Sequence, residues 1–213
     1  VIDVIVEATN EENGEAIGLS KSTISSGGGD DAIYVEAWGE SSSKSMVDSL
    51  IEAGNGDDYI TIDGDIENST IKAGDGDDVV HAKDADAPDD IDMGAGNDFL
   101  IINSDANDTS LDGGTGSDWI AFRTVNWGAS AKNYTINSGV AANFENLLGT
   151  DNDDTLGGDA NANIIVGSAG ADTINGNDGN DTLWGDCKTS ACTNLISQNQ
   201  SAYSIGSGGN DTL

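Results

Sequence analysis

The segment that decides the fold runs from Ala53 to Asp118 and contains one glycine-rich hexapeptide four times. The copies recur with a 20-residue period: AGNGDD at 53–58, AGDGDD at 73–78, MGAGND at 93–98 and GGTGSD at 113–118. A fifth copy, SGGGDD at 26–31, precedes them at a longer, 27-residue spacing, and we expect the additional residues to form an insertion at 39–44. Such a repeat predicts a solenoid, in which each repeat packs against its neighbours.

The residues around the hexapeptides repeat as well and form three apolar columns. The columns are Ile51, Ile71, Ile91 and Leu111; Ile60, Val80, Leu100 and Ile120; and Ile62, Ala82, Ile102 and Phe122. The alternation in the segment Ile60-Thr61-Ile62 is typical of half-buried strands. We therefore predict short strands that stack coil on coil and bury these columns.

A second block of repeats has a period of nine residues. Its loops are GTDNDD at 149–154, GDANAN at 158–163, GSAGAD at 167–172 and GNDGND at 176–181, and GSGGND at 206–211 follows after an insertion. An apolar residue comes two positions after each of the first four loops: Leu156, Ile165, Ile174 and Leu183. We expect each loop to stack on the second loop after it, so that successive loops lie on opposite edges.

The repeats divide the chain into four parts. We expect degenerate coils at 1–23, a solenoid with the 20-residue period at 24–122, a non-repeating connector at 123–148 and a nonapeptide block at 149–213 with an insertion at 185–205. The sequence stops inside a predicted strand, whereas a solenoid needs a polar cap on its last coil. We therefore expect a larger parent protein.

The composition is strongly acidic, with 39 Asp and Glu against 7 Lys and Arg and a formal net charge of -32. Such a chain repels nucleic acid phosphates and anionic membrane surfaces, and no apolar run approaches the ~20 residues of a membrane span. High charge with only 36% hydrophobic residues is also compatible with disorder of the metal-free chain. Asp outnumbers Glu by 30 to 9 and occurs together with Gly, which favours turns that present short carboxylate ligands.

The loops and the apolar residues after them resemble the Gly-Gly-x-Gly-x-Asp-x-apolar-x nonapeptide of the RTX (repeats-in-toxin, haemolysin-type) calcium-binding family. The segment 143–150 looks like the stretch that often precedes such arrays. The resemblance implies an all-β fold, a right-handed parallel β-roll or β-solenoid with calcium ions stacked between glycine-rich loops. Calcium accepts six to eight oxygen ligands, and a glycine turn lets carbonyl oxygens converge on it.

Carried over residue by residue, the resemblance implies the following ligand loops. In the first block they are Gly27, Gly29, Asp31, Gly54, Gly56, Asp58, Gly74, Gly76, Asp78, Gly94, Gly96, Asp98, Gly114, Gly116 and Asp118. In the second block they are Gly149, Asp151, Asp154, Gly158, Gly167, Gly170, Asp172, Gly176, Asp178, Asp181, Gly206, Gly208 and Asp211. We expect roughly seven or eight calcium ions in all.

One loop departs from the family pattern, and one rival motif fails. Loop 158–163 has Asn161 in place of the second glycine and Asn163 in place of the ligating Asp, so we expect Asn161 to keep the left-handed turn and the site to be weaker. An EF-hand counted from Asp151 would need Gly at position 6 and Glu at position 12, where this sequence has Leu156 and Ala162.

Two smaller features lie outside the loops. Cys187 and Cys192 are expected to form a local disulfide, which indicates an oxidising, extracellular setting; a zinc site would need two more soft ligands. A further column of Tyr59, Val79, Phe99 and Trp119 should point outward by strand alternation. Those side chains either stabilise the sheet, lie under an unrepeated segment, or form a contact face for another subunit or domain.

Three functions are compatible with these patterns. The first is an extracellular structural or adhesive module of a larger secreted cell-surface protein, of the S-layer, biofilm or adhesin type, which folds on calcium binding. The second is the C-terminal secretion and folding module of a hydrolase, and the third is binding of a polysaccharide. The chain has a single His and lacks GxSxG and HExxH motifs, so we expect no catalysis by it. We favour the first, with calcium and other domains or copies of the parent protein as partners.

Overall fold

The computed structural model describes residues 1–9, 16–38, 43–85, 89–102, 110–122, 131–138 and 141–186. These residues form strands and turns and contain no helix, and so none that could span a membrane. The chain divides into two compact units. The first comprises Val1–Asp118 and Gly139–Asn143, and the second comprises Trp119–Ser138 and Phe144–Leu213. The fold is a parallel β-solenoid, as the repeat predicts.

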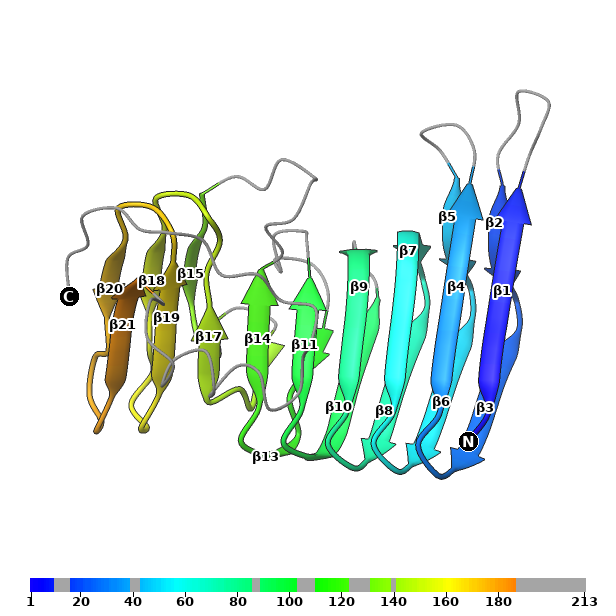
Figure 1. The fold of residues 1–213 in the computed structure, drawn as a ribbon, viewed down its shortest axis with the longest axis horizontal. Coiled ribbons are helices and arrows are strands. Elements are labelled where there is room, and N and C mark those ends of the chain that lie inside the picture. Colours follow the sequence, from blue (N-terminus) through cyan, green and yellow to red (C-terminus); the bar gives the residue numbers. More distant parts are fainter. Residues whose placement is uncertain are drawn as a thin grey trace. The chain divides into compact units, whose positions relative to one another are not determined.

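The first unit consists of two parallel sheets whose strands alternate along the chain (Figure 1). One sheet contains, in order, β1 (Asp3–Thr9), β4 (Ala32–Trp38), β7 (Tyr59–Glu67), β9 (Val79–Ala85) and β11 (Phe99–Ile102), with β2 (Ile17–Ser20) and β5 (Lys44–Val47) beside them. The other contains β3 (Thr23–Gly28), β6 (Leu50–Asn55), β8 (Thr70–Asp75), β10 (Asp90–Gly96), β12 (Ser110–Asp112) and β16 (Ala141–Ala142), and β13 (Thr115–Gly116) pairs with β10.

The register of the first unit follows the sequence period. Ile51 pairs with Ile71, and Ile71 with Ile91, so each partner lies one period further along the chain. Across the insertion at 39–44 the register takes the longer, 27-residue step, and Ile33 pairs with Ile60. The insertion therefore leaves the solenoid coil intact, and successive coils stay in register.

The second unit is built on twice the nine-residue period. Its strands are β14 (Trp119–Phe122), β17 (Asn146–Leu148), β19 (Ile164–Ser168) and β21 (Thr182–Asp186) in one sheet, and β15 (Asn133–Thr135), β18 (Thr155–Gly157) and β20 (Thr173–Asn175) in the other. Leu147 pairs with Ile165 and Leu156 with Ile174, which confirms that each loop stacks on the second loop after it. The described residues of the non-repeating stretch include β15, β16 and β17, which pair with strands of the repeats.

The three apolar columns form the core, as predicted. Every residue of these columns is at most 2% exposed, from Ile51 and Ile60 to Phe122. The side chains lie between the two sheets, and each coil covers the apolar residues of the next. The glycine-rich turns therefore remain at the edge, where the chain passes from one sheet to the other.

Three of the four residues of the predicted outward-facing column are buried. Val79 is 6% exposed, Phe99 1% and Trp119 8%, and only Tyr59 is half-buried, with its ring centroid 5.9 Å from that of Tyr34. Strand alternation assigns a side chain to one face of a sheet but does not tell whether that face is covered. Val79, Phe99 and Trp119 therefore do not form a free contact face, which leaves the other two predicted roles, stabilising the sheet or lying under an unrepeated segment.

Replacing Phe99 by Ala should therefore lower the free energy of unfolding by about 3–5 kcal/mol, the usual loss for a buried aromatic residue. The matched control is Ile5→Ala in β1 of the same sheet, because Ile5 is 64% exposed and its loss should be small. Urea unfolding at saturating calcium measures both changes. Equal losses in the two variants would contradict the burial of Phe99.

Candidate metal site

The glycines of the first unit's loops adopt a backbone conformation that other residues avoid. Gly74 has φ = 126° and Gly76 has φ = 138°, both in the left-handed region. A Cβ atom on Gly74 would lie 1.9 Å from the carbonyl oxygen of Gly54, and one on Gly76 would lie 2.1 Å from that of Gly56. The loops thus pack backbone on backbone, and only glycine leaves the carbonyl oxygens room between them.

Hydrogen bonds hold the stacked loops in register. The N–H of Gly56 donates to the carbonyl of Asp75 at 2.7 Å, and the N–H of Gly76 donates to the carbonyl of Ala95 at 2.8 Å. Each loop is therefore tied through the backbone to the loop of the following coil.

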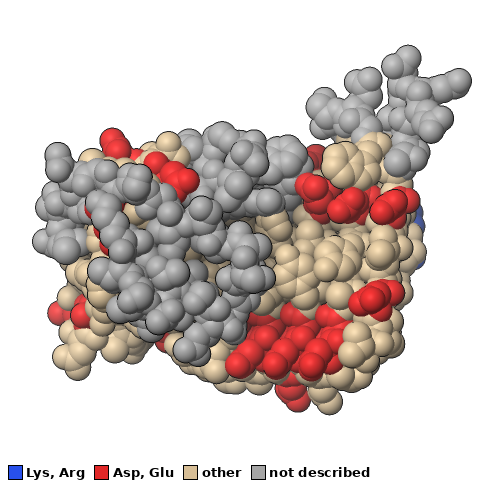
Figure 2. All heavy atoms as spheres, in the orientation of Figure 1, with Lys and Arg blue, Asp and Glu red and all other residues tan. Residues whose placement is uncertain are grey.

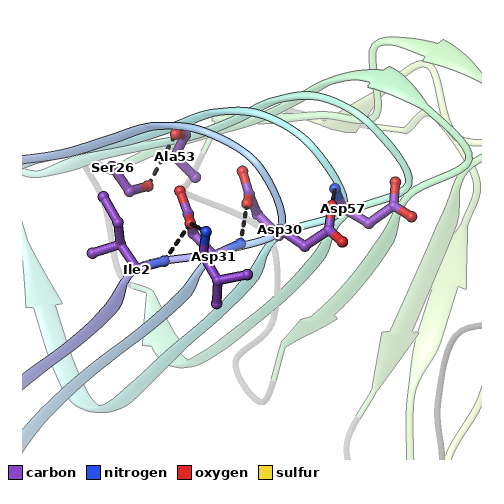
Figure 3. A network of polar contacts seen from close by, with 8 residues as sticks. Ile2, Ser26, Asp30, Asp31, Ala53 and Asp57 are labelled. Atoms are coloured by element: carbon purple, nitrogen blue, oxygen red, sulfur yellow. Dashed lines mark hydrogen bonds and ion pairs between the residues drawn. The ribbon is translucent and has the colours of Figure 1, made fainter.

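The last Asp of each hexapeptide points inward and forms a continuous row, here called the inner Asp row. Its members are Asp31, Asp58, Asp78, Asp98 and Asp118, and each is at most 3% exposed. The N–H of each of the first four donates to Oδ1 of the next one along the row at 2.7–2.8 Å. Each carboxylate therefore reaches back to the coil before its own, and at the start of the row the N–H of Ile2 donates to Oδ1 of Asp31 (Figure 3).

The second oxygen of these carboxylates is buried without a hydrogen-bond partner. This holds for Oδ2 of Asp31, Asp58, Asp78 and Asp98. Within the described ranges, no Lys or Arg forms an ion pair with Asp58, Asp78 or Asp98. Leaving charged oxygens buried and unpaired is strongly unfavourable, so these positions require a bound cation or a proton.

The pKa values of Asp58, Asp78 and Asp98 are raised by this burial. Burial raises the pKa of Asp78 to about 7, and the carboxylates of Asp58, Asp57 and Asp77 add to the rise against the hydrogen bond from the Asp58 N–H. Burial likewise raises the pKa of Asp98 to about 8, and it also raises that of Asp58. The physical cause is loss of water around a charge, reinforced by like charges in the neighbouring coils.

The residue before each inner Asp faces the solvent and forms a second row. Asp30, Asp57, Asp77, Asn97 and Ser117 are exposed, and the N–H of each later residue donates to the side-chain oxygen of the one before it. Figure 3 shows the first of these links, from Asp57 to Asp30. Acidic side chains gather at this loop edge in Figure 2. We did not predict this outer row, although its 20-residue spacing is visible in the sequence.

The fit to calcium depends on the backbone as well as the carboxylates. In the described part of the chain, no three Asp, Glu, His or Cys side chains are arranged so that they could hold a metal ion by themselves. Each gap between loops instead combines a buried carboxylate oxygen with closely approaching glycine carbonyls. An all-oxygen donor set of carboxylates and carbonyls suits calcium, so the residues fit this ion.

In the second unit the motif residues form two shorter rows. The N–H of Asp154 donates to Oδ1 of Asp172 at 2.9 Å, and that of Asn163 donates to Oδ1 of Asp181 at 3.0 Å. The amide of Asn163 also donates from Nδ2 to the carbonyl of Glu145 at 3.1 Å, which a carboxylate could not do. Asn161 lies outside the left-handed region, so the prediction that it keeps the left-handed turn is wrong.

In the first loop of the second unit, both carboxylate oxygens of Asp154 accept hydrogen bonds. Oδ2 of Asp154 accepts the N–H of Thr150 at 2.6 Å, and Oδ1 accepts the Thr150 hydroxyl at 3.0 Å and the N–H of Lys132 at 2.6 Å. Thr150 and Asn152 stand where loops 53–58 and 73–78 have glycine. Asp154 therefore differs from the inner Asp row, whose second oxygens are unpartnered.

The structure thus brings the predicted glycines and Asp residues of 26–118 to one edge of the first unit. In the second unit, Gly149, Gly158, Gly167 and Gly176 are buried, and a Cβ on any of them would lie within 2.6 Å of the Asp or Asn that ends its own loop. Asp151 and Asp178 are exposed. The predicted ligands Gly206, Gly208 and Asp211 and the predicted disulfide of Cys187 and Cys192 lie outside the described residues.

Comparison with known families agrees with this geometry. The family model of the RTX calcium-binding nonapeptide repeat matches residues 61–86 and 157–186, with four copies. A search of curated proteins finds no match to the chain. The matched segments contain loop 73–78 of the first unit and three successive loops of the second. The chain therefore carries repeats of the RTX calcium-binding family, folded as a parallel β-solenoid.

Proposed function

We propose that the chain is a calcium-dependent structural module, in which ions bound between successive loops neutralise the buried carboxylates and hold the coils together. The observation that carries the proposal is the row of buried, unpartnered Oδ2 atoms at Asp31, Asp58, Asp78 and Asp98. Without cations these charges repel one another across neighbouring coils. Folding and calcium binding are then one coupled equilibrium.

The inner Asp row and the loop glycines would hold the ions in the first unit. Because each carboxylate reaches back to the preceding coil, a gap would use the Asp of the later coil together with glycine carbonyls. Calcium would supply positive charge and an oxygen-binding centre. In the second unit Asp172 and Asp181 take the corresponding positions. The total of roughly seven or eight ions stays a prediction.

The biological setting we infer is a secreted or cell-surface protein, in which this module forms a segment that becomes rigid when calcium binds. The module itself performs no catalysis. RTX repeats are typical of secreted proteins. The continuous stacking of coils over the described residues, with an interior of aliphatic side chains, supports a structural role. An S-layer, biofilm or adhesin protein would use such a module to resist extension once calcium is bound.

Asp78→Asn separates the charge of the inner Asp row from its hydrogen bonds. The amide oxygen can still accept the N–H of Asp58, but the buried charge is gone. We expect calcium affinity to fall by at least about tenfold, the effect of losing one charged ligand, while the calcium-free protein becomes more stable because no charge remains to be desolvated.

The matched control is Asp77→Asn, which removes the same charge from the exposed residue next to it. Its effect on calcium affinity should be small and should weaken with salt. Calorimetric calcium titration and urea unfolding in chelator measure both quantities. Equal effects of the two variants would show that the inner Asp row does not bind the ions.

A further inference from the structure

One contact between successive coils of the second unit uses amides where the inner Asp row uses carboxylates. Glu145 and Asn163 directly precede the paired strands β17 and β19, so they take the same position in successive coils. Asn163 is 2% exposed, and its Nδ2 donates to the carbonyl oxygen of Glu145 at 3.1 Å. Asn163 therefore reaches back to the preceding coil as Asp78 does, but with a neutral donor instead of a charge.

The hydrogen bonds of its own loop fix the orientation of the Asn163 amide. Its Oδ1 accepts the N–H of Asp159 at 2.9 Å. A turned amide would bring two donors together at Asp159 and two oxygens together at Glu145, so the nitrogen must face the preceding coil. Calcium binds oxygen ligands, whereas this amide nitrogen only donates, so the side chain offers no ligand on that side.

A second amide, from the stretch without a repeat, links the same two coils. Asn137 uses both hydrogens of Nδ2, one toward the carbonyl oxygen of Phe144 at 3.0 Å and one toward Oδ2 of Asp159 at 2.9 Å. Its Oδ1 accepts the N–H of Phe144 at 2.9 Å. Phe144 is fully buried, so Asn137 ties a core residue of one coil to loop 158–163 of the next.

The carboxylate that Asp159 contributes to this contact is satisfied by amides. Its Oδ1 accepts the N–H of Asn161 at 2.7 Å, and its Oδ2 accepts Nδ2 of Asn161 at 3.0 Å in addition to that of Asn137. Asp78 in the first unit presents the opposite case, because its Oδ2 is buried without a hydrogen-bond partner. The contact therefore contains no carboxylate that requires a cation.

We propose that Asn137 and Asn163 take the place of a calcium ion between these two coils, so that the contact closes by hydrogen bonds alone. A neutral amide leaves no buried charge to be neutralised, and each carbonyl that it faces already has a donor. Calcium is then needed on this edge only from the next gap, where the N–H of Asn163 donates to Oδ1 of Asp181. The nonapeptide block is thereby joined to the stretch before it independently of calcium. This inference rests on the proposed function of the loops.

Asn163→Ala tests whether a bound ion depends on this amide. Native mass spectrometry in a calcium titration should show as many bound ions as in the unaltered chain, because no ligand is lost. Asp181→Ala is the matched variant, since it changes the residue at the same position one coil later and should lose one ion. Loss of an ion in Asn163→Ala would overturn the proposal, whereas an unchanged count in Asp181→Ala would contradict the proposed function at this edge.

Asn137→Gly gives a second measure that does not depend on counting ions. Asn137 has φ = 55°, which glycine adopts without strain, so the variant removes the side chain but keeps the turn. At saturating calcium the backbone amides of loop 158–163 should exchange with deuterium at least about tenfold faster, because the groups that Asn137 joins lose their partner. The measurement decides the question also when Asn163→Ala fails to fold.

Asn143→Gly is the control for the added backbone freedom. Asn143 has φ = 58° and is exposed, and its side chain donates to Asp112 outside this contact, so exchange in loop 158–163 should stay unchanged. If Asn137→Gly exchanges like the unaltered chain, or if the two variants accelerate exchange equally, the amides do not hold these coils together and the proposal is wrong.

Discussion

Removal of calcium at about pH 9 should abolish most of the β-sheet circular dichroism of the protein, because the buried carboxylates are then charged and unpaired. Asp78 and Asp98 have pKa values of about 7 and about 8, so at this pH both must lose their protons in the folded state. The chain would escape the repulsion by unfolding. Addition of calcium should restore the signal cooperatively, whereas magnesium, with its smaller octahedral shell, should substitute poorly.

The pH dependence of the calcium-free protein follows from the direction of these pKa changes. The folded-state pKa values lie above 3.8, the ordinary pKa of an aspartic acid, so between about pH 4 and pH 7 the folded state binds more protons than the unfolded chain. Stability without calcium is therefore greatest at low pH and falls as the pH rises through this window. Each such carboxyl contributes a slope of about 1.4 kcal/mol per pH unit.

The calcium affinity should depend on pH in the opposite direction, because protons and calcium compete for the same carboxylates. It should increase from about pH 5 to about pH 8, and binding should release protons. Circular dichroism in chelator at several pH values, together with calcium titrations at the same values, tests both halves. A calcium-free protein that stays fully folded at about pH 9 would contradict the requirement for the ion.

Gly74→Ala should strongly destabilise the first unit. The new Cβ would lie 1.9 Å from the carbonyl oxygen of Gly54, and φ of 126° is a conformation that alanine rarely adopts. The stacked loops would have to separate, with loss of their hydrogen bonds and of the calcium gap. We expect a loss of more than about 4 kcal/mol in the free energy of unfolding at saturating calcium.

Gly27→Ala is the matched control, since Gly27 has φ of 100° but no atom lies within 4 Å of the added Cβ. It should lose only the backbone term of about 1–2 kcal/mol. Urea unfolding midpoints and calcium affinities of the two variants give the comparison. Similar losses would mean that backbone strain, and not the contact between stacked loops, makes glycine necessary.

Much of the first unit could be predicted from the sequence because its repeat is local. An apolar residue recurs 20 residues after each of Ile51, Ile60 and Ile62. The period therefore sets both the strands and their register. The same periodicity places Asp58 and Asp78 in one row. In the second unit the nine-residue period gives the alternation of edges, and the pairing of Leu156 with Ile174 follows from it.

Other features could not be read from the repeat. Phe99 and Trp119 occupy a column that alternation assigns to the outer face, but their burial depends on what covers that face. Asp57 and Asp58 are adjacent and chemically identical, yet one is exposed and the other 2% exposed, because the turn directs successive side chains to opposite sides. Lys132 lies in a stretch without a repeat. Only the pairing of β15 with β18 shows that it stands beside Asp154, in the position that an Asp takes in the repeats.

The sequence by itself determined the solenoid, its two periods and the chemistry of its loops, because a repeated pattern of apolar residues, Gly and Asp has to be satisfied in the same way by every coil. Only the tertiary structure decided which charges are buried and how each is balanced. In the first unit the Oδ2 atom of Asp78 is enclosed without a partner, whereas in the second unit Asp154 is satisfied by Thr150 and Lys132. The physical reason is that desolvation and the distances between charges depend on the packing of coils, which residue order does not specify.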